Sequence, residues 1–182
     1  LRVDRTAPSA PVIQSSTHQQ LVWSNQRTAD LHWHAVDAHS RVAGYAVWRD
    51  TSPATTISGA AAPDTQSSIA MDDGLSYVHV AAVDSAGNWG PTAHYQVRVQ
   101  ATPPAAPIPS LLEPATTQRW HKVTGVTCGW SEPPCLSGIA GYSFTLTPGD
   151  SGAPPDSTLD TTQRQAQFTG LASGYHTLGV RA

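Results

Sequence analysis

The chain has 182 residues and a formal net charge of −3. None of its apolar runs approaches the roughly 20 residues needed to span a bilayer, so direct membrane insertion is not expected. The ten Lys and Arg residues are scattered, which leaves no basic patch for nucleic acid. Pro (15) and Gly (14) occur throughout, and apolar residues are not spaced as in helices. Composition therefore predicts an all-β protein.

Strands of the first hundred residues are predicted from alternation of apolar and polar residues between turn residues. In 29–35 (ADLHWHA), Leu31 and Trp33 share one face while His32 and His34 share the other, as in a half-buried strand. Short strands at this spacing are typical of an antiparallel sandwich of about seven strands. Further strands are predicted at 44–50, 67–71, 76–84 and 93–99.

The second half of the chain repeats the first. Residues 23–45 align with 120–142 at a constant offset of 97 residues, so that each Trp of the first segment meets a Trp of the second. A period of this length accommodates one β-sandwich per repeat. The sequence therefore predicts a first domain at 1–100, in which 1–4 is the tail of a preceding repeat, and a second domain at 101–182.

Several segments resemble the fibronectin type III and immunoglobulin-like modules that recur in large bacterial surface and secreted proteins. They are VAGYAVWRD (42–50), AVDSAGNWG (82–90), GIAGY (138–142) and the D-x-TAP-x-AP pattern that starts at Asp4. The resemblance covers essentially the whole chain and implies two tandem sandwiches, with neighbouring repeats of the same protein as partners, in an extracellular or cell-surface setting. The strand tyrosine that ties down a corner in such modules is replaced by Ser76 and His176.

The alignment predicts that the second sandwich lacks its last strand. Ala182 aligns with Ala82, so the equivalent of 93–99 is absent and a strand edge is expected to be exposed. A fragment of a longer array is the preferred explanation. The alternative is that a strand from another chain completes the sheet, which would make the chain a subunit that polymerises by strand donation.

Aromatic residues divide into a predicted core and a candidate contact surface. Large rings at aligned inward positions are expected to fill the two sandwiches, and Trp23 and Trp120 to cover one end of each core. Trp48 alternates out of phase with the inward residues, so it is predicted to lie on an outer face beside Tyr77 or His79. Cross-strand packing is the alternative for this group. The core residues are Trp33, Tyr45, Trp130 and Tyr142, and the candidate contacts for glycan or protein are Trp48, Tyr77 and Trp89.

The sequence predicts neither a cofactor nor a metal site. His32 and His34 point the same way, but a third ligand is hard to find, so they are interpreted as solvent-facing. Asp84 is predicted to bond turn amides in DSAGN (84–88). Calcium is the alternative for Asp84, and it would require oxygen donors from neighbouring loops, such as Asp37 and Asp4.

Cys128 and Cys135 are predicted to form a local disulfide, because two cysteines in an apparently extracellular chain suggest a bridge. Two free buried thiols are the alternative. Neither cysteine is expected to act as a nucleophile without a facing His.

The chain carries no nucleophile elbow, phosphate-binding loop or zinc-protease motif, so it is predicted not to be an enzyme. The proline-rich segment 100–109 is expected to form a semi-rigid joint between two sandwiches and so to extend them into a rod. The sequence thus predicts a spacer, stalk or adhesion scaffold in a larger bacterial surface or secreted protein. The alternatives are a module that binds glycan or protein through exposed aromatics, an accessory domain of a secreted hydrolase, and the polymerising subunit.

Overall fold

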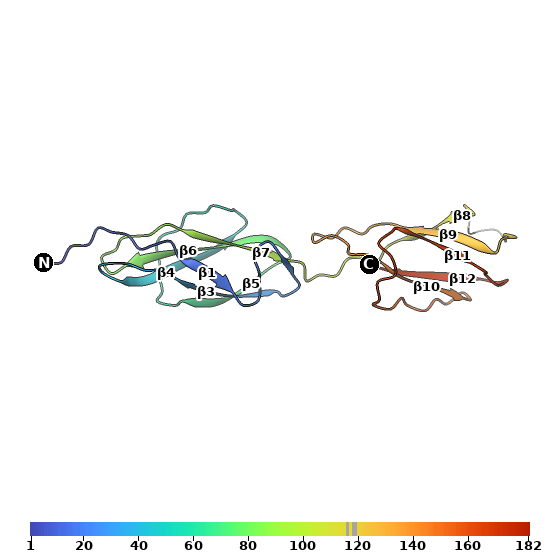
Figure 1. The fold of residues 1–182 in the computed structure, drawn as a ribbon, viewed down its shortest axis with the longest axis horizontal. Coiled ribbons are helices and arrows are strands. Elements are labelled where there is room, and N and C mark those ends of the chain that lie inside the picture. The colour runs from blue at the N-terminus through green and yellow to red at the C-terminus, as the bar shows by residue number, and fades with distance from the viewer. Residues whose placement is uncertain (116, 118–119) are drawn as a thin grey trace. The chain divides into compact units, whose positions relative to one another are not determined.

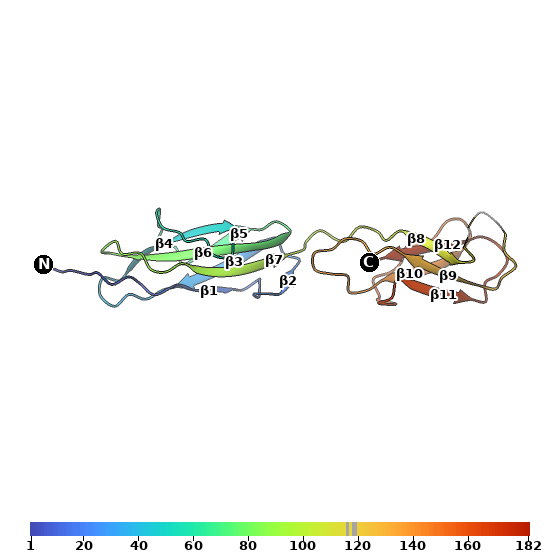
Figure 2. The same ribbon diagram turned by 90° about the horizontal axis from the view of Figure 1, so that it is seen from above.

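The computed structural model describes residues 1–115, 117 and 120–182, and these residues form strands and loops without a helix. They divide into two compact units, Leu1–Thr102 (unit 1) and Pro103–Ala182 (unit 2). Within each unit the strands lie in two layers, as Figures 1 and 2 show from two directions. No helix of the described part has the length and apolar character needed to cross a bilayer. The prediction of an all-β protein is confirmed.

Unit 1 is built from two sheets that face each other. One sheet has the order β1-β3-β5 and the other the order β2-β7-β6-β4. All pairs are antiparallel except β2 with β7, which run parallel. The strands are β1 (Val12–Ser15), β2 (Trp23–Ser24), β3 (Thr28–His34), β4 (Val42–Asp50), β5 (Gln66–Ala70), β6 (Gly74–Asp84) and β7 (Ala93–Val99).

The long strands of unit 1 begin and end within two residues of the predicted ranges, because period-two alternation is strong in each. The alternation in β3 is complete: Leu31 and Trp33 are buried, and His32 and His34 are exposed. The structure adds β2, which pairs only two residues with β7. A strand of that length carries no periodic signal.

Trp33 lies at the centre of the core of unit 1, where it is 3% exposed. Its indole Nε1 donates a hydrogen bond to the carbonyl oxygen of Asp64 at 3.1 Å, so burial leaves no unpaired donor. The ring of Tyr45 packs edge-on against it at 6.4 Å between centroids. Alternate residues of β6 and β7 fill the opposite side of the core, namely Val78, Val80, Tyr95, Val97 and Val99.

A glycine precedes the inward tyrosine in both units, and close backbone approach explains why. Tyr45 pairs with Ala62 and Tyr142 pairs with Thr161, each in an isolated bridge beside the glycine. A Cβ at Gly44 would lie 3.0 Å from the carbonyl oxygen of Ala62, and a Cβ at Gly141 would lie 2.7 Å from that of Thr161. The repeated Gly-Tyr pair therefore marks a place where a side chain would crowd the backbone of the neighbouring segment.

Tyr95 ties the second sheet of unit 1 to the segment after β1. Its hydroxyl donates a hydrogen bond to the backbone carbonyl of the buried His18. We expect Tyr95→Phe to lower the free energy of unfolding by about 1 to 3 kcal/mol, because a buried carbonyl then loses its donor. Urea titration measures this loss. Tyr77→Phe, which removes a partly exposed hydroxyl, should cost less, and an equal loss in both variants would contradict the prediction.

Unit 2 repeats this arrangement with fewer strands in its second sheet. Its sheets have the orders β11-β9-β8 and β10-β12, and all pairs are antiparallel. Trp130 is 5% exposed and packs against the rings of Tyr142 and Phe144. The strands are β8 (Pro109–Glu113), β9 (Gly125–Trp130), β10 (Ser143–Pro148), β11 (Gln165–Thr169) and β12 (His176–Arg181).

Two expectations for unit 2 differ from the structure. Trp120 does not cover the core: it is 76% exposed and its ring contacts Tyr175, which is 67% exposed. Cys128 and Cys135 are free thiols. Cys128 is buried in β9, while Cys135 lies in the following loop, where its Sγ donates to the carbonyl oxygen of Gly138 at 3.4 Å.

Candidate functional site

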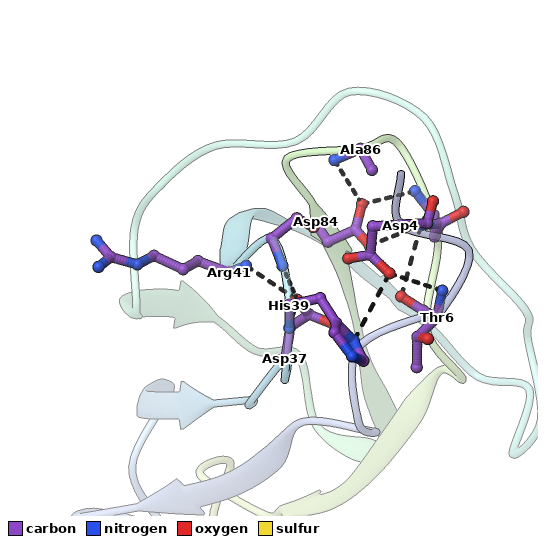
Figure 3. Close-up of polar contacts among 9 residues, drawn as sticks. Asp4, Thr6, Asp37, His39, Arg41, Asp84 and Ala86 are labelled. Atoms are coloured by element: carbon purple, nitrogen blue, oxygen red, sulfur yellow. Dashed lines mark hydrogen bonds and ion pairs between the residues drawn. The ribbon is translucent and has the colours of Figure 1, made fainter. Parts of the chain in front are cut away.

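Three aspartates that lie far apart in the sequence meet at one end of unit 1. Asp4 belongs to the segment before β1, Asp37 to the loop between β3 and β4, and Asp84 is the last residue of β6. One carboxylate oxygen of each lies within 4.8 Å of the corresponding oxygens of the other two. We call these three residues the acidic cluster. Figure 3 shows the cluster, with the side chain of Arg41 directed away from the carboxylates.

Each carboxylate of the acidic cluster is held through its Oδ1 atom by backbone amides of its own loop. The geometry is that of Asx turns, in which an aspartate accepts hydrogen bonds from residues two to four positions later. The carboxylates are therefore fixed in direction by the main chain. The donor amides, at 2.7 to 3.1 Å, belong to Thr6 (for Asp4), His39, Ser40 and Arg41 (for Asp37), and Ala86 and Asn88 (for Asp84).

The second oxygen of two of these carboxylates has no hydrogen-bond donor. Oδ2 of Asp4 and Oδ2 of Asp37 are buried and unpartnered. The Asp4 side chain is 8% exposed, and Asp84 is 2% exposed. Among the residues the structure describes, the cluster forms an ion pair only with His39, whose Nδ1 lies 3.8 Å from Oδ1 of Asp4.

The pKa values of Asp37 and Asp84 lie below the usual value, so both groups are ionised at neutral pH. Burial by itself raises the pKa of Asp37, and the charge of Asp84 raises it further, but the backbone amides outweigh both effects. Burial also raises the pKa of Asp84, and the side-chain and backbone amides of Asn88 outweigh it. The negative charges of Asp37 and Asp84 are therefore held close together, on one half-buried and one buried residue.

The outer face of the sheet β2-β7-β6-β4 carries a second polar group. Trp48 of β4 pairs in register with His79 of β6, and His79 pairs with His94 of β7. Asp50, two residues after Trp48, lies opposite Tyr77. The ring of Tyr77 stacks on that of His79 with 6.4 Å between centroids. Because Trp48 pairs with His79, and Tyr77 lies two residues before His79 on β6, Trp48 and Tyr77 share a sheet face. Trp48 is 57% exposed there.

His79 points to the outer face of the sheet, as the alternation predicts, yet it is 0% exposed. The loop after β4 explains this burial. The Thr55 hydroxyl donates to Oδ2 of Asp50 at 2.7 Å. Two residues later the amide of Ile57 donates to the hydroxyl of Thr92, just before β7, at 3.1 Å. The loop therefore folds back from the edge strand across the outer face of β6.

Asp50, His79 and His94 form a continuous chain of hydrogen bonds. The Nε2 atom of His79 lies 2.9 Å from Oδ1 of Asp50, and its Nδ1 atom lies 2.7 Å from Nδ1 of His94. Burial lowers the pKa of His94, and the neighbouring His79 lowers it further against the opposing charge of Asp50. The chain satisfies both nitrogens of the buried ring, which explains how a histidine is accommodated there.

The stability contributed by Asp50 depends on acid pH. Hydrogen bonds from Thr55 and His79 lower the pKa of Asp50 from 3.8 to about 2. Because the folded pKa is the lower one, this stabilisation is complete above the unfolded value and is lost as the pH falls through the folded value. We expect Asp50→Asn to lower the urea midpoint at about pH 5, and the difference from wild type to shrink between about pH 4 and pH 2. A constant difference over this range would contradict the assignment.

The remaining sequence candidates are dispersed over unit 1. His32 and His34 are exposed on β3, and Nε2 of His32 lies 2.9 Å from Oε1 of Gln14. Trp89 is half-buried in the turn after β6, where it pairs with Val83. The exposed pair of Trp120 and Tyr175 in unit 2 was not predicted from the sequence. The alignment equated Trp120 with Trp23, which forms part of β2.

Comparison with known proteins places the chain beside part of a larger enzyme. No protein-family model matches the sequence. The chain is 33% identical over 143 residues to Exoglucanase B of Cellulomonas fimi, a match that covers 76% of this chain and 12% of that protein. The matched stretch is longer than either unit, so it extends across both. The chain thus corresponds to a small part of its relative.

Proposed function

We propose that this chain is a non-catalytic accessory part of a secreted hydrolase that acts on polysaccharide. The observation that carries the proposal is that a stretch of the chain reaching into both units matches a segment of a protein named an exoglucanase. The match accounts for only 12% of that protein, so most of the relative lies outside the matched stretch. The lack of a catalytic motif in the sequence supports a non-catalytic role. We include a secreted location in the proposal, and the similarity to an exoglucanase supports it.

We further propose that both units are fibronectin type III or immunoglobulin-like sandwiches. The three-stranded sheet β1-β3-β5 packed on a second sheet around a buried Trp supports this, and unit 2 repeats the pattern with β8-β9-β11. Such a fold does not specify a function. In our proposal the pair serves as a spacer between neighbouring modules, with the proline-rich segment 100–109 as its joint.

Two measurements test the accessory role. Purified chain incubated with amorphous cellulose and soluble β-glucan is expected to release no reducing sugar above a protein-free blank. The complete coding sequence around this segment is expected to encode a glycoside hydrolase domain. Sugar release that persists in a repurified sample would overturn the non-catalytic assignment, and a complete protein without a hydrolase domain would overturn the accessory role.

Exposed aromatic rings favour glycan binding as a second candidate function. Trp48 is 57% exposed on a sheet face, and Trp120 and Tyr175 form an exposed pair in unit 2. Aromatic rings present apolar faces on which sugar rings can stack. Binding to insoluble cellulose is measured by depletion of the chain from solution. We expect Trp48→Ala or Trp120→Ala to reduce the bound fraction without changing the thermal midpoint.

Val36→Ala is the matched control for these two variants, since it removes an exposed apolar side chain that has no ring. It is expected to leave cellulose binding unchanged. Wild-type binding that survives both tryptophan substitutions would exclude these rings as the binding surface. Absence of wild-type binding would leave the spacer role as the function of the pair.

A further inference from the structure

The acidic cluster has the electrostatics of a cation site. Asp4, Asp37 and Asp84 bring three carboxylates together; Asp84 is buried, Asp4 and Asp37 are half-buried, and the Oδ2 atoms of the latter two are shielded from water. Repulsion between like charges grows as the local dielectric falls, and a buried charge without a partner is strongly destabilising. The guanidinium of Arg41 belongs to the same loop as Asp37 but points away, as Figure 3 shows. Among the described residues, backbone and Asn88 amides and the ring of His39 are what face these carboxylates, and no Lys or Arg forms an ion pair with them. A bound cation would supply the positive charge that the cluster lacks.

Two unpartnered carboxylate oxygens indicate where a cation would bind. Oδ2 of Asp4 is buried and has no hydrogen-bond partner, on a side chain that is itself 8% exposed. Oδ2 of Asp37 is buried and unpartnered in the same way. Buried polar atoms in native proteins are almost always satisfied, so an unpartnered pair in one cluster signals a missing ligand. Because the backbone amides occupy the Oδ1 atoms, the Oδ2 atoms of Asp4 and Asp37 remain free to coordinate.

The three carboxylate ligands favour calcium over magnesium and zinc. Calcium binds carboxylate and carbonyl oxygens in flexible geometries, and ligands supplied by separate loops suit that flexibility. Magnesium requires near-ideal octahedral geometry and retains its waters. Zinc prefers nitrogen and sulfur ligands, and the only such group that ion-pairs with the cluster among the described residues is the largely exposed ring of His39.

We propose that unit 1 binds one calcium ion at Asp4, Asp37 and Asp84. The ion joins the segment before β1 to the β3–β4 loop and to the end of β6, three parts that contribute one carboxylate each. Asn88 already links two of these three parts. Its Nδ2 donates to Oδ2 of Asp84 at 2.8 Å and lies 3.3 Å from the carbonyl oxygen of Asp4. Calcium therefore acts as a clamp on the N-terminal segment of the unit.

Differential scanning calorimetry of the whole chain, stripped with EDTA and then titrated with CaCl2, tests the site. Calcium sites of extracellular modules have dissociation constants of about 10⁻⁴ to 10⁻³ M. At a hundredfold excess over the lower value, the unfolding temperature of unit 1 is expected to rise by about 10 °C, since the ion binds only the folded state. The same concentration of MgCl2 is expected to produce a much smaller rise. No rise with CaCl2, or a rise with ZnCl2 alone, would overturn the proposal.

Asp37→Asn separates calcium binding from a purely structural role. The asparagine Oδ1 can accept the same backbone hydrogen bonds, while the negative charge is lost. In EDTA the variant is expected to unfold at or below the wild-type temperature, because the backbone amides that lower the pKa of Asp37 favour its ionised form. Adding CaCl2 should then produce no rise above the variant's own temperature in EDTA. A wild-type rise in this variant would overturn the site. Asp73→Asn is the matched control, since Asp73 also accepts backbone amides and ion-pairs with Arg27, and it should keep the full rise.

Trypsin provides a second readout that needs no variant. Arg5 is exposed and directly follows Asp4, whose Oδ1 accepts the amide of Thr6. Calcium bound at Asp4 should slow cleavage of the Arg5–Thr6 bond by about tenfold, because cleavage requires local opening of that segment. Cleavage is followed by mass spectrometry with protease activity equalised on a peptide substrate. An unchanged rate in CaCl2 would contradict the clamp.

Discussion

Trp33→Ala is expected to lower the free energy of unfolding of unit 1 by about 3 to 5 kcal/mol, the usual cost of removing a fully buried tryptophan. The ring is 3% exposed, contacts Tyr45 edge-on and satisfies its own Nε1 through Asp64. Truncation therefore removes dispersion contacts, leaves a cavity between the sheets and deprives a carbonyl of its donor. Urea unfolding followed by circular dichroism measures the loss.

Trp48→Ala is the matched control for that variant. It removes the same ring from the outer face of β4, where the side chain is 57% exposed. A change of about 0.5 kcal/mol or less is expected, as for most surface substitutions. Similar losses in the two variants would show that the division between core and surface in unit 1 is incorrect.

His79→Ala is expected to destabilise unit 1 by about 3 kcal/mol, from the lost volume of a side chain with no exposure and from the broken polar chain. His79→Phe separates these two effects. Phenylalanine restores the buried ring but cannot bond Asp50 or His94, both of which reach water and can be hydrated. About half of the loss should therefore be recovered.

Thermal and urea unfolding of both His79 variants measure these changes. Substitution of the exposed partner, His94→Ala, should cost much less than His79→Ala, because water replaces its contacts. A loss of equal size in His94→Ala would show that the polar chain, and not the buried volume, stabilises this face of the sheet.

Much of the fold was predictable because strand patterns are local. In β3, the alternation of Leu31 and Trp33 with His32 and His34 depends only on which faces of a pleated strand meet the core. The loop after β4 was not predictable in this way. Its return over His79 depends on single hydrogen bonds from Thr55 and from the amide of Ile57, which have no periodic signature.

The candidate site was only partly predictable. The sequence named Asp4 and Asp37 as the donors that a calcium ion at Asp84 would need, but it preferred turn chemistry. The structure shows that these roles are compatible, because the two oxygens of a carboxylate can serve different partners. For Asp37, Oδ1 accepts turn amides while Oδ2 is unpartnered, and one of its carboxylate oxygens lies within 4.8 Å of oxygens of the other two aspartates. A preference for one role over the other was therefore unnecessary.

The sequence by itself determined the all-β class, the inward Trp and Tyr of each repeat and the positions of the long strands, because these follow from side-chain alternation and from turn residues. Only the tertiary structure decided that three distant aspartates meet, two of them with an unpartnered oxygen, that His79 is buried beneath a loop and that the two cysteines are free thiols. Those features depend on the distances between segments that are remote along the chain. Such distances are set by the packing of whole sheets and loops, and no local pattern encodes them.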